Sequence, residues 1–371
     1  MGNVRPSIMR LLDTVHRWTG GLIGVLLALL GLSGALLSQK KLWVAVPGVN
    51  AYRPYTDAEL GVLISRLTET DAARPFYILL AGPEFGVHRV SWAEGSGAYA
   101  GRDGEIVASW TSTWDRPELW LFDLHHYFFA GETGAVIAGV LALVGLGFIV
   151  TGVILWFRTW RKFRFRLWPS RITPPQIAHH HRDLGIVVAP LLFLSCLTGA
   201  MMTLRPVAAV VLNPFSSPSE MIEASKPPER QGGSLSNSLD WTAMIGEAGR
   251  QFPSATVRLI SLPRADGDLI AMRLKQSREW HPNGRTMAWF DASSGTLVET
   301  RDALRLPVGL KLCNGVYPLH AGMTGSAVWR FTMTVTGLAL TLLGALATWS
   351  FWFRRMRRPA RRSAARNVDL R

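Results

Sequence analysis

The chain alternates between long stretches without charged side chains and mixed stretches of polar and apolar residues. Four stretches of 21 to 25 residues carry no charge, and a helix needs about 20 residues to cross a bilayer. The pattern therefore predicts four membrane-spanning helices. We expect the first to be retained, because it exceeds the apolar core of a signal peptide and no A-x-A site follows. The stretches are Trp18–Ser38, Thr133–Phe157, Leu184–Leu204 and Phe331–Phe353.

The two mixed segments, 39–130 and 205–330, each predict a helix followed by short strands. Thr56 is placed to cap a helix over Asp57–Thr68, and Asp240 to open one that ends at Phe252. Residues 213–238 are rich in Pro, Ser, Gly and Asn and predict a linker. Strands are expected at 76–80, 87–92 and 106–110 in the first segment, and at 257–262, 269–274, 286–290 and 296–300 in the second.

The net charge of +14 gathers at three places. Residues 1–17, 158–182 and 354–371 hold 18 of the 40 basic residues, against only Asp13 and Asp369. This is the positive-inside pattern, so we expect both termini and the 158–182 link in the cytoplasm of a bacterial inner membrane. The same distribution argues against nucleic acid as a partner, and the lipid bilayer is the expected surroundings.

These patterns predict a mainly α integral membrane protein: a four-helix transmembrane bundle with two small α+β periplasmic domains, built as a tandem repeat. The expected order is an N-terminus with helix 1 (1–38), a first periplasmic domain with the lead-in to helix 2 (39–130), helix 2 (131–157), a basic link (158–182), helix 3 (183–204), a second periplasmic domain (205–318), helix 4 with its lead-in (319–353) and a basic tail (354–371).

One histidine stands near the start of each apolar stretch: His16, His125, His181 and His320. The first and third recur in the same setting, His-Arg-x-x-Gly followed by Ser-Gly or Thr-Gly, with glycines 4 and 18 residues after the histidine. Ionisable side chains are costly in a bilayer and usually mark a functional site.

The predicted topology decides which histidines meet. His16 and His181 share one level near the cytoplasmic face, and His125 and His320 share one near the periplasmic face. Helices 1 and 3 face each other across a four-helix bundle, as do 2 and 4, so each pair predicts the two axial ligands of one haem iron. Two cysteines exclude an iron–sulfur cluster, and no C-x-x-C-H motif allows covalent haem. The expected cofactors are two b-type haems.

Neighbouring residues leave alternatives open. His126 abuts His125, and His180 precedes His181; the recurring motifs favour His125 and His181. His88 and His281 are expected at the surface. Arg17 and Arg182 are candidate partners of haem propionates, or anchors at the cytoplasmic face. Glycines on the helices either make room for a porphyrin or pack helix on helix; they are Gly20, Gly21, Gly24, Gly31, Gly34, Gly131, Gly134, Gly139, Gly185, Gly199, Gly322 and Gly325.

These motifs resemble the PepSY-associated transmembrane proteins and, within them, the di-haem ferric-siderophore reductases of the FoxB type. The resemblance rests on His16-Arg17-Trp18-x-Gly20, Leu124-His125 with Gly131-Glu132-x-Gly134, His181-Arg182-x-x-Gly185, and Leu319-His320 with Gly322 and Gly325. It implies an oxidoreductase that passes electrons from an unknown cytoplasmic donor to a ferric siderophore in the periplasm, for iron release and uptake.

Two alternatives stay open: a haem oxidoreductase for another periplasmic acceptor, and a non-catalytic PepSY-domain protein with a regulatory or binding role. The resemblance implies no catalytic side chain beyond the four histidines. An unbroken helix from His125 to Arg158 would run about 50 Å. Histidines at its two ends would hold the two haems too far apart for direct electron transfer. We therefore expect helix starts at Ser7 and Thr173, which place His16 and His181 two turns or more inside their helices.

Overall fold

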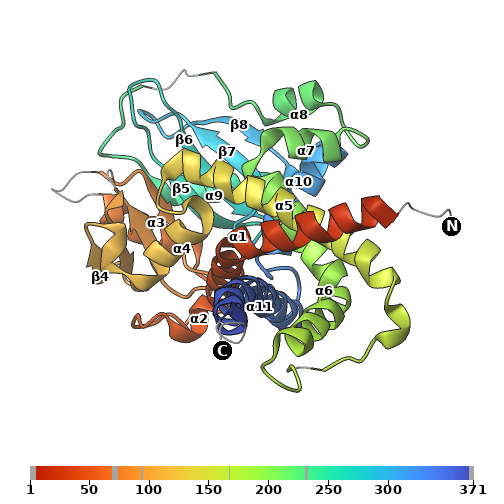
Figure 1. Cartoon of the computed structure of the whole chain (residues 1–371). Helices are drawn as coiled ribbons and strands as arrows, with labels where there is room; N and C mark the ends of the chain where they lie inside the picture. The colour runs from red at the N-terminus through yellow and green to blue at the C-terminus, as the bar shows by residue number, and fades with distance from the viewer. Residues whose placement is uncertain (1–5, 69–73, 93–94, 167, 230–232, 367–371) are drawn as a thin grey trace.

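The computed structural model describes residues 6–68, 74–92, 95–166, 168–229 and 233–366 (Figure 1). Arg5 and residues 367–371, which entered the charge count, lie outside these ranges. Four helices are long and apolar enough to cross a membrane, as the sequence predicts. They are α1 (Pro6–Ser38), α5 (Gly131–Phe157), α6 (Pro174–Thr203) and α11 (Ala327–Arg366).

These four helices form a closed ring. The helix α1 packs on α11 and α5, and α6 packs on the same two helices. Consequently α1 and α6 face each other diagonally, as the topology argument expected. Large apolar side chains such as Leu22, Leu29 and Leu36 on α1 remain exposed on the outside of the bundle. Such a surface suits lipid, because an apolar face of this size is rare on a water-soluble protein.

The contact between α1 and α11 is made by backbone against backbone. A methyl group added at Gly31 would lie 2.5 Å from the carbonyl oxygen of Gly337, and one added at Gly344 would lie 2.3 Å from that of Gly24. Small residues that let two helices approach this closely are typical of membrane bundles. Gly24 and Gly31 therefore serve helix packing and leave no room there for a cofactor.

The strands found in the described residues form one antiparallel sheet of eight, in the order β4-β3-β2-β1-β5-β6-β7-β8. The first segment supplies β1 to β4 and the second supplies β5 to β8. The seam is the β1–β5 pair, where Ile78 lies opposite Ile260. The strands are β1 (Tyr77–Leu79), β2 (His88–Ser91), β3 (Gly97–Ala100), β4 (Ile106–Trp110), β5 (Thr256–Ser261), β6 (Ile270–Lys275), β7 (Thr286–Phe290) and β8 (Leu297–Arg301).

Two amphipathic helices, α3 (Asp57–Thr68) and α9 (Trp241–Gln251), cover one face of this sheet. They also contact each other, and one apolar core joins Ile64 of α3, Ile245 of α9 and the seam residues. The predicted caps are present: Thr56 forms a capping box with Glu59, and Asp240 accepts the backbone N–H of Ala243. The two segments thus build one shared layer, where the sequence predicted two small domains.

Two further helices precede the second and fourth spans. Helix α4 (Pro117–Tyr127) leads to α5, and α10 (Val308–His320) leads to α11. The expected linker also contains a helix, α8 (Pro218–Ser225), because Ser217 caps it and Pro218 occupies its first turn. Figure 1 shows α8 near the β8 end of the sheet, where Arg301 reaches the carbonyl of Lys226. The remaining short elements are α2 (Lys40–Trp43), α7 (Arg205–Leu212) and the 3-10 turns η2 (Thr113–Asp115), η3 (Trp160–Lys162) and η4 (Ala303–Arg305).

Candidate functional site: two histidine pairs in the bundle

His16 of α1 and His181 of α6 face each other across the diagonal of the bundle. Their ring centres are 6.3 Å apart and their planes are nearly perpendicular. His16 is the eleventh residue of α1 and His181 the eighth of α6, so both lie two turns or more inside their helices, as expected. Phe148 of α5 packs edge-on against the His16 ring at 5.1 Å.

His125 and His320 form a second pair with almost the same spacing. Their ring centres are 6.2 Å apart. His125 packs against Gly34 at the far end of α1, and His320 packs against Gly199 at the far end of α6. The Ser-Gly and Thr-Gly motifs that follow His16 and His181 in the sequence therefore contact the other pair of histidines. All four histidines consequently meet in the two pairs that the sequence predicts.

His125 stands on a short helix that is separate from the spanning helix after it. It lies near the end of α4, and no unbroken helix joins it to Arg158, because the chain turns between α4 and α5. Phe128 and Phe129 adopt the left-handed region with φ of 44° and 60°, and Gly131 follows with φ of 53°. The second half turns in the same place after His320, through Gly322 and Gly325 with φ of 71° and 73°.

The first turn follows the end of α4 at Tyr127, two residues after His125, and the second follows the end of α10 at His320 itself. The histidine then points from the end of α4 or α10 to the bundle, instead of lying within a spanning helix. Glycine tolerates positive φ, whereas phenylalanine there is strained. The first turn accepts this strain, and Phe129 stacks on Trp114 at 4.8 Å.

Hydroxyl groups fix the ring orientation of three of the four histidines. The Nδ1 atom lies 2.9 Å from Ser33 in His125, 2.9 Å from Thr198 in His320 and 2.8 Å from Thr151 in His16. Each hydroxyl donates its own proton to a carbonyl one turn earlier in its helix. It therefore accepts from Nδ1–H, and the lone pair of each ring stands on Nε2. Metal-binding histidines are usually held by such a partner on the second nitrogen.

The fourth histidine lacks a well-formed bond of this kind. Within the described part of the chain, Nδ1 of His181 and Oγ1 of Thr348 are both buried without a hydrogen-bond partner; the Leu343 carbonyl is the acceptor that His181 approaches. Thr348 occupies the place in the second half that Thr151 occupies in the first. By this recurrence Thr348 is the counterpart of Thr151 in the second half.

The spacing within each pair fits two axial ligands of one iron. A metal lies about 2.0–2.1 Å from an imidazole nitrogen, and the ring centre lies about 1 Å further out, so two axial rings have centres about 6 Å apart. Among the residues that the structure describes, no three His, Cys, Asp or Glu side chains gather as ligands of a bare metal ion. Two histidines per site therefore suit a haem iron, whose four other ligands are the nitrogens of the porphyrin.

Room for such a group exists beside the first pair. Gly20 and Gly185 each follow their histidine by four residues. A methyl group added at Gly185 would meet nothing within 4 Å, and one added at Gly20 would meet only atoms at 3.9–4.0 Å. These two positions fit the porphyrin hypothesis, whereas Gly21 and Gly139 pack tightly on the side chains of Phe351 and Leu204.

The neighbouring histidines do not join the pairs. The His126 ring stacks on Phe122 at 3.9 Å, and its Nδ1 lies 3.1 Å from the Phe122 carbonyl oxygen. His180 is buried in α6, and the ring that His16 faces at 6.3 Å belongs to its neighbour His181. The geometry therefore favours His125 over His126 and His181 over His180.

His88 and His281 are buried, and the expectation that they lie at the surface is wrong. His88 is fully covered inside the sheet. Its Nδ1 accepts the N–H of Ala81 and its Nε2–H donates to Tyr55, 2.7 Å away. Burial lowers the pKa of His88 to about 4, so the neutral ring is a structural element.

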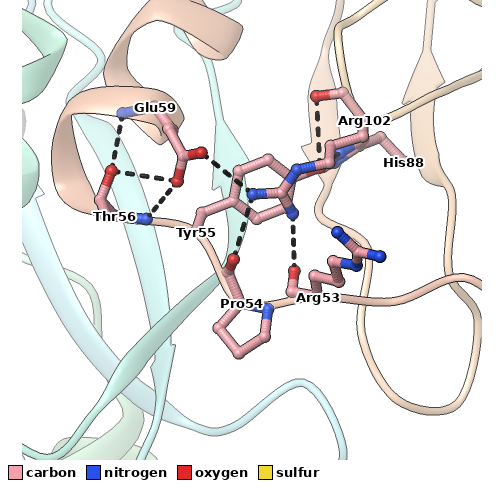
Figure 2. A network of polar contacts seen from close by, with 7 residues as sticks. All are labelled: Arg53, Pro54, Tyr55, Thr56, Glu59, His88 and Arg102. Atoms are coloured by element: carbon pink, nitrogen blue, oxygen red, sulfur yellow. Dashed lines mark hydrogen bonds and ion pairs between the residues drawn. The ribbon is translucent and has the colours of Figure 1, made fainter.

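Figure 2 shows how Tyr55 connects this ring to Arg102, whose guanidinium lies 4.1 Å from the Tyr55 ring centre and bonds the carbonyls of Arg53 and Pro54. The network fastens the entry of α3 to the sheet.

The two candidate propionate partners already have acidic neighbours. Arg182 donates to Asp183 at 2.6 Å and to the carbonyl of Lys162, and Asp183 accepts the N–H of Arg164. Arg17 makes a looser, exposed contact with Asp13 at 3.4 Å. Arg182 therefore fastens the 158–182 link to α6. The two cysteines are free: Cys196 is buried against Gly145, and Cys313 is exposed.

The two pairs lie far apart along the bundle. Seventeen residues separate His16 from Ser33 on α1, and the same number separates His181 from Thr198 on α6. At 1.5 Å per residue the pairs are about 26 Å apart along the helix axes. If each pair held a haem, the edge-to-edge gap that an electron crosses would be shorter than this separation between the pairs.

Comparison with known proteins identifies a family whose members resemble this chain. The profile of the family described as the PepSY-associated TM region matches residues 14–355, nearly the whole chain. An uncharacterized protein of Pseudomonas aeruginosa, PA4219, is 25% identical over 253 residues, which is 64% of each chain. The match thus spans a little under two thirds of that relative's length.

Proposed function

Since the chain belongs to the family of the PepSY-associated TM region, we propose that it is a di-haem b electron-transfer protein of the bacterial inner membrane. In this proposal it reduces a ferric siderophore in the periplasm with electrons from the cytoplasmic side. The observation that carries the proposal is the presence of two histidine pairs, 6.3 and 6.2 Å between ring centres, at two depths of one bundle.

His16 and His181 would hold one haem, and His125 and His320 the other. Each bis-histidine haem would supply one-electron transfer that needs no proton donor in the protein. Three of the four histidines donate Nδ1–H to a hydroxyl oxygen, and their Nε2 lone pairs therefore stay available for iron. The three hydroxyls belong to Ser33, Thr151 and Thr198. The helices that carry the histidines would hold both iron positions fixed.

The distribution of charge and the topology support the proposed direction of electron transfer, from the cytoplasm to the periplasm. The basic link and tail favour a cytoplasmic position for the His16–His181 pair. The sheet then lies in the periplasm, on the side of the His125–His320 pair, where a ferric chelate arrives as substrate. Reduction of Fe³⁺ to Fe²⁺ weakens its binding to hard oxygen ligands, so the siderophore releases iron. The recurrence of helix, four strands, histidine helix and helix in both halves supports a tandem repeat.

Spectroscopy of the purified protein tests the haem sites. We expect a Soret band, α-band sharpening on reduction by dithionite, and two haems per chain. Alanine at His16, His125, His181 or His320 should each lower haem content. Alanine at His126, whose ring stacks on Phe122, and at His179, an exposed residue of α6, should leave two haems in place. A preparation without haem from haem-replete cells would refute the proposal and favour a regulatory protein.

A second measurement tests the reaction. The dithionite-reduced protein, freed of excess reductant, should be reoxidised by ferric siderophores in a stopped-flow instrument. Haem bands that stay reduced with a panel of ferric chelates, but are reoxidised by a quinone or a disulfide, would assign the protein to another periplasmic acceptor.

A further inference from the structure

A cluster of cationic side chains lies between the sheet and α10, outside the histidine pairs. Arg273 belongs to β6, Lys275 ends that strand, and Arg285 lies in the β6–β7 loop. Arg273 alternates with Met272 and Leu274, which are buried in the core under α3 and α9. Because side chains alternate across a strand, Arg273 points from the opposite face of the sheet.

That face meets α10 one turn before His320. The ring of His281, from the same loop, packs on Tyr317 with 5.4 Å between ring centres. Trp280 lies against Gly315, whose added methyl group would be 3.4 Å from the indole. Tyr317 stands three residues before His320, so the cluster borders the His125–His320 pair.

The charges of this cluster are not balanced. Within the described residues neither Arg273 nor Arg285 forms an ion pair, and the Nε atom of each is buried without a hydrogen-bond partner. The one nearby acid, Glu279, accepts from the N–H of Gln276 and Arg285 and the hydroxyl of Thr286. Desolvation and the neighbouring Arg285 lower the pKa of Arg273 to about 10. Both arginines are half-buried, and partly desolvated charges without an acid partner favour the binding of an anion.

The first half of the molecule differs by holding an acid at the corresponding place, although Nε of Arg89 on β2 is also buried there without a hydrogen-bond partner. Glu118 stands seven residues before His125, is buried, bonds Arg116 at 2.5 Å and accepts the hydroxyl of Tyr99. The residue seven places before His320 is Cys313, which faces Arg285 without a negative charge. The second half therefore has no acid at the position of Glu118 to offset its cationic side chains. An anion from outside the chain can occupy that position.

We propose that Arg273 and Arg285, assisted by the field of Lys275, bind a carboxylate group beside the His125–His320 pair. The inference rests on the proposed function, because the carboxylate has two sources there: a propionate of the haem, or a carboxylate of the ferric chelate. Guanidinium groups match carboxylate geometry and form strong, charge-assisted hydrogen bonds. Both sources place the anion where electrons leave the protein.

The test uses the full-length haem-loaded protein with Arg273→Gln, Arg285→Gln and Cys313→Glu. The last variant restores the acid of the first half, and Cys313→Gln is its neutral control. Arg250→Gln on α9 removes an equal charge from the covered face of the sheet. Calorimetric titration with ferric citrate, a carboxylate chelate, and with a cationic ferric tris-hydroxamate reports on substrate binding. Redox titration reports on the haem.

If the carboxylate is the chelate's, Arg273→Gln, Arg285→Gln and Cys313→Glu should raise the Kd for ferric citrate about tenfold or more. The Kd for the cationic chelate should not rise. If it is a propionate, the same three variants should lower the midpoint potential or retention of the haem at His125 and His320, with unchanged citrate binding. Either result supports the site.

The inference is overturned if the three variants match Arg250→Gln and Cys313→Gln in both titrations. A wild-type protein that lacks haem would refute the proposed function separately, and ferric citrate titration of the same variants would still decide the chelate arm.

Discussion

The hydroxyl partners of the histidines carry the most specific residue-scale information. The hydroxyls of Ser33 and Thr198 each donate a hydrogen bond to a carbonyl of their own helix. Each also accepts a hydrogen bond from a histidine of another helix. This arrangement sets the tautomer of His125 and His320. The sequence marked the Ser-Gly and Thr-Gly motifs as a repeat, but their role depends on tertiary contact across 92 and 122 residues and was not readable from spacing.

Removing these hydroxyls should weaken the proposed haem site at His125 and His320. We expect Ser33→Ala and Thr198→Ala to lower haem affinity at the His125–His320 pair about 10- to 100-fold, as is typical for such partners of metal ligands. The measurement is haem content after challenge with apomyoglobin, together with the midpoint potential. Ser38→Ala on the same helix removes a hydroxyl that bonds Thr334 and should have no effect. Equal haem retention in Ser33→Ala, Thr198→Ala and Ser38→Ala would contradict this role.

His88 should make the sheet sensitive to acid. Burial lowers its pKa from 6.5 to about 4. Between these two pH values His88 is protonated in the unfolded chain and neutral in the folded chain. Stability is therefore full above pH 6.5 and decreases as the pH falls toward 4, by about 3 kcal/mol at most. We expect His88→Gln to flatten this slope in thermal unfolding experiments between pH 7 and 4. An unchanged slope would show that His88 is not the titrating group.

At the scale of elements, the spans and most strands were predictable because long apolar runs and period-two alternation are local signals. Strand β3 was missed, since Gly97–Ala100 is built from small residues with little strand preference. The turn after His125 was missed for another reason. Phe128 and Phe129 carry no turn signal, and their left-handed backbone is imposed by packing.

The close contact of α1 with α11 leads to an element-scale prediction. Gly31→Ala places a methyl group 2.5 Å from a backbone oxygen of α11, and overpacking of this kind destabilises by about 1–3 kcal/mol. Gly147→Ala on α5 is the matched control, because its methyl group meets nothing within 4 Å and gains helix propensity of up to about 1 kcal/mol. Thermal unfolding in detergent should therefore separate the two variants in opposite directions. A Gly31→Ala protein as stable as Gly147→Ala would mean that the two helices lie further apart.

At the scale of the whole molecule, the shared sheet binds the two halves together. The seam residues Ile78 and Ile260 are fully buried in a core that both segments build. Nothing in the sequence showed this, because the edge of a strand has the same residue pattern whether it ends a domain or pairs with a strand 182 positions away. The joint sheet also fixes α4 and α10 with respect to each other, which the His125–His320 pair requires.

The pairing of the histidines across this assembly gives the last prediction. The two pairs are about 26 Å apart along α1 and α6, so loss of one haem should leave the other bound. His16→Ala should therefore retain about one haem per chain, and His16→Ala with His181→Ala should retain the same amount, because both changes remove the same site. His16→Ala with His320→Ala should retain none. Residues that act as one unit are non-additive in this way, and independent sites add.

Haem quantification in the three proteins decides between the pairings. If His16 instead shared an iron with His320, the double variant of these two would keep one haem, and the double variant of His16 and His181 would lose both. If each histidine only stabilised the fold, all single variants would lose haem in proportion to their loss of thermal stability. The ring-centre distances of 6.3 and 6.2 Å favour the first pattern, because two axial imidazoles on one iron need about that spacing.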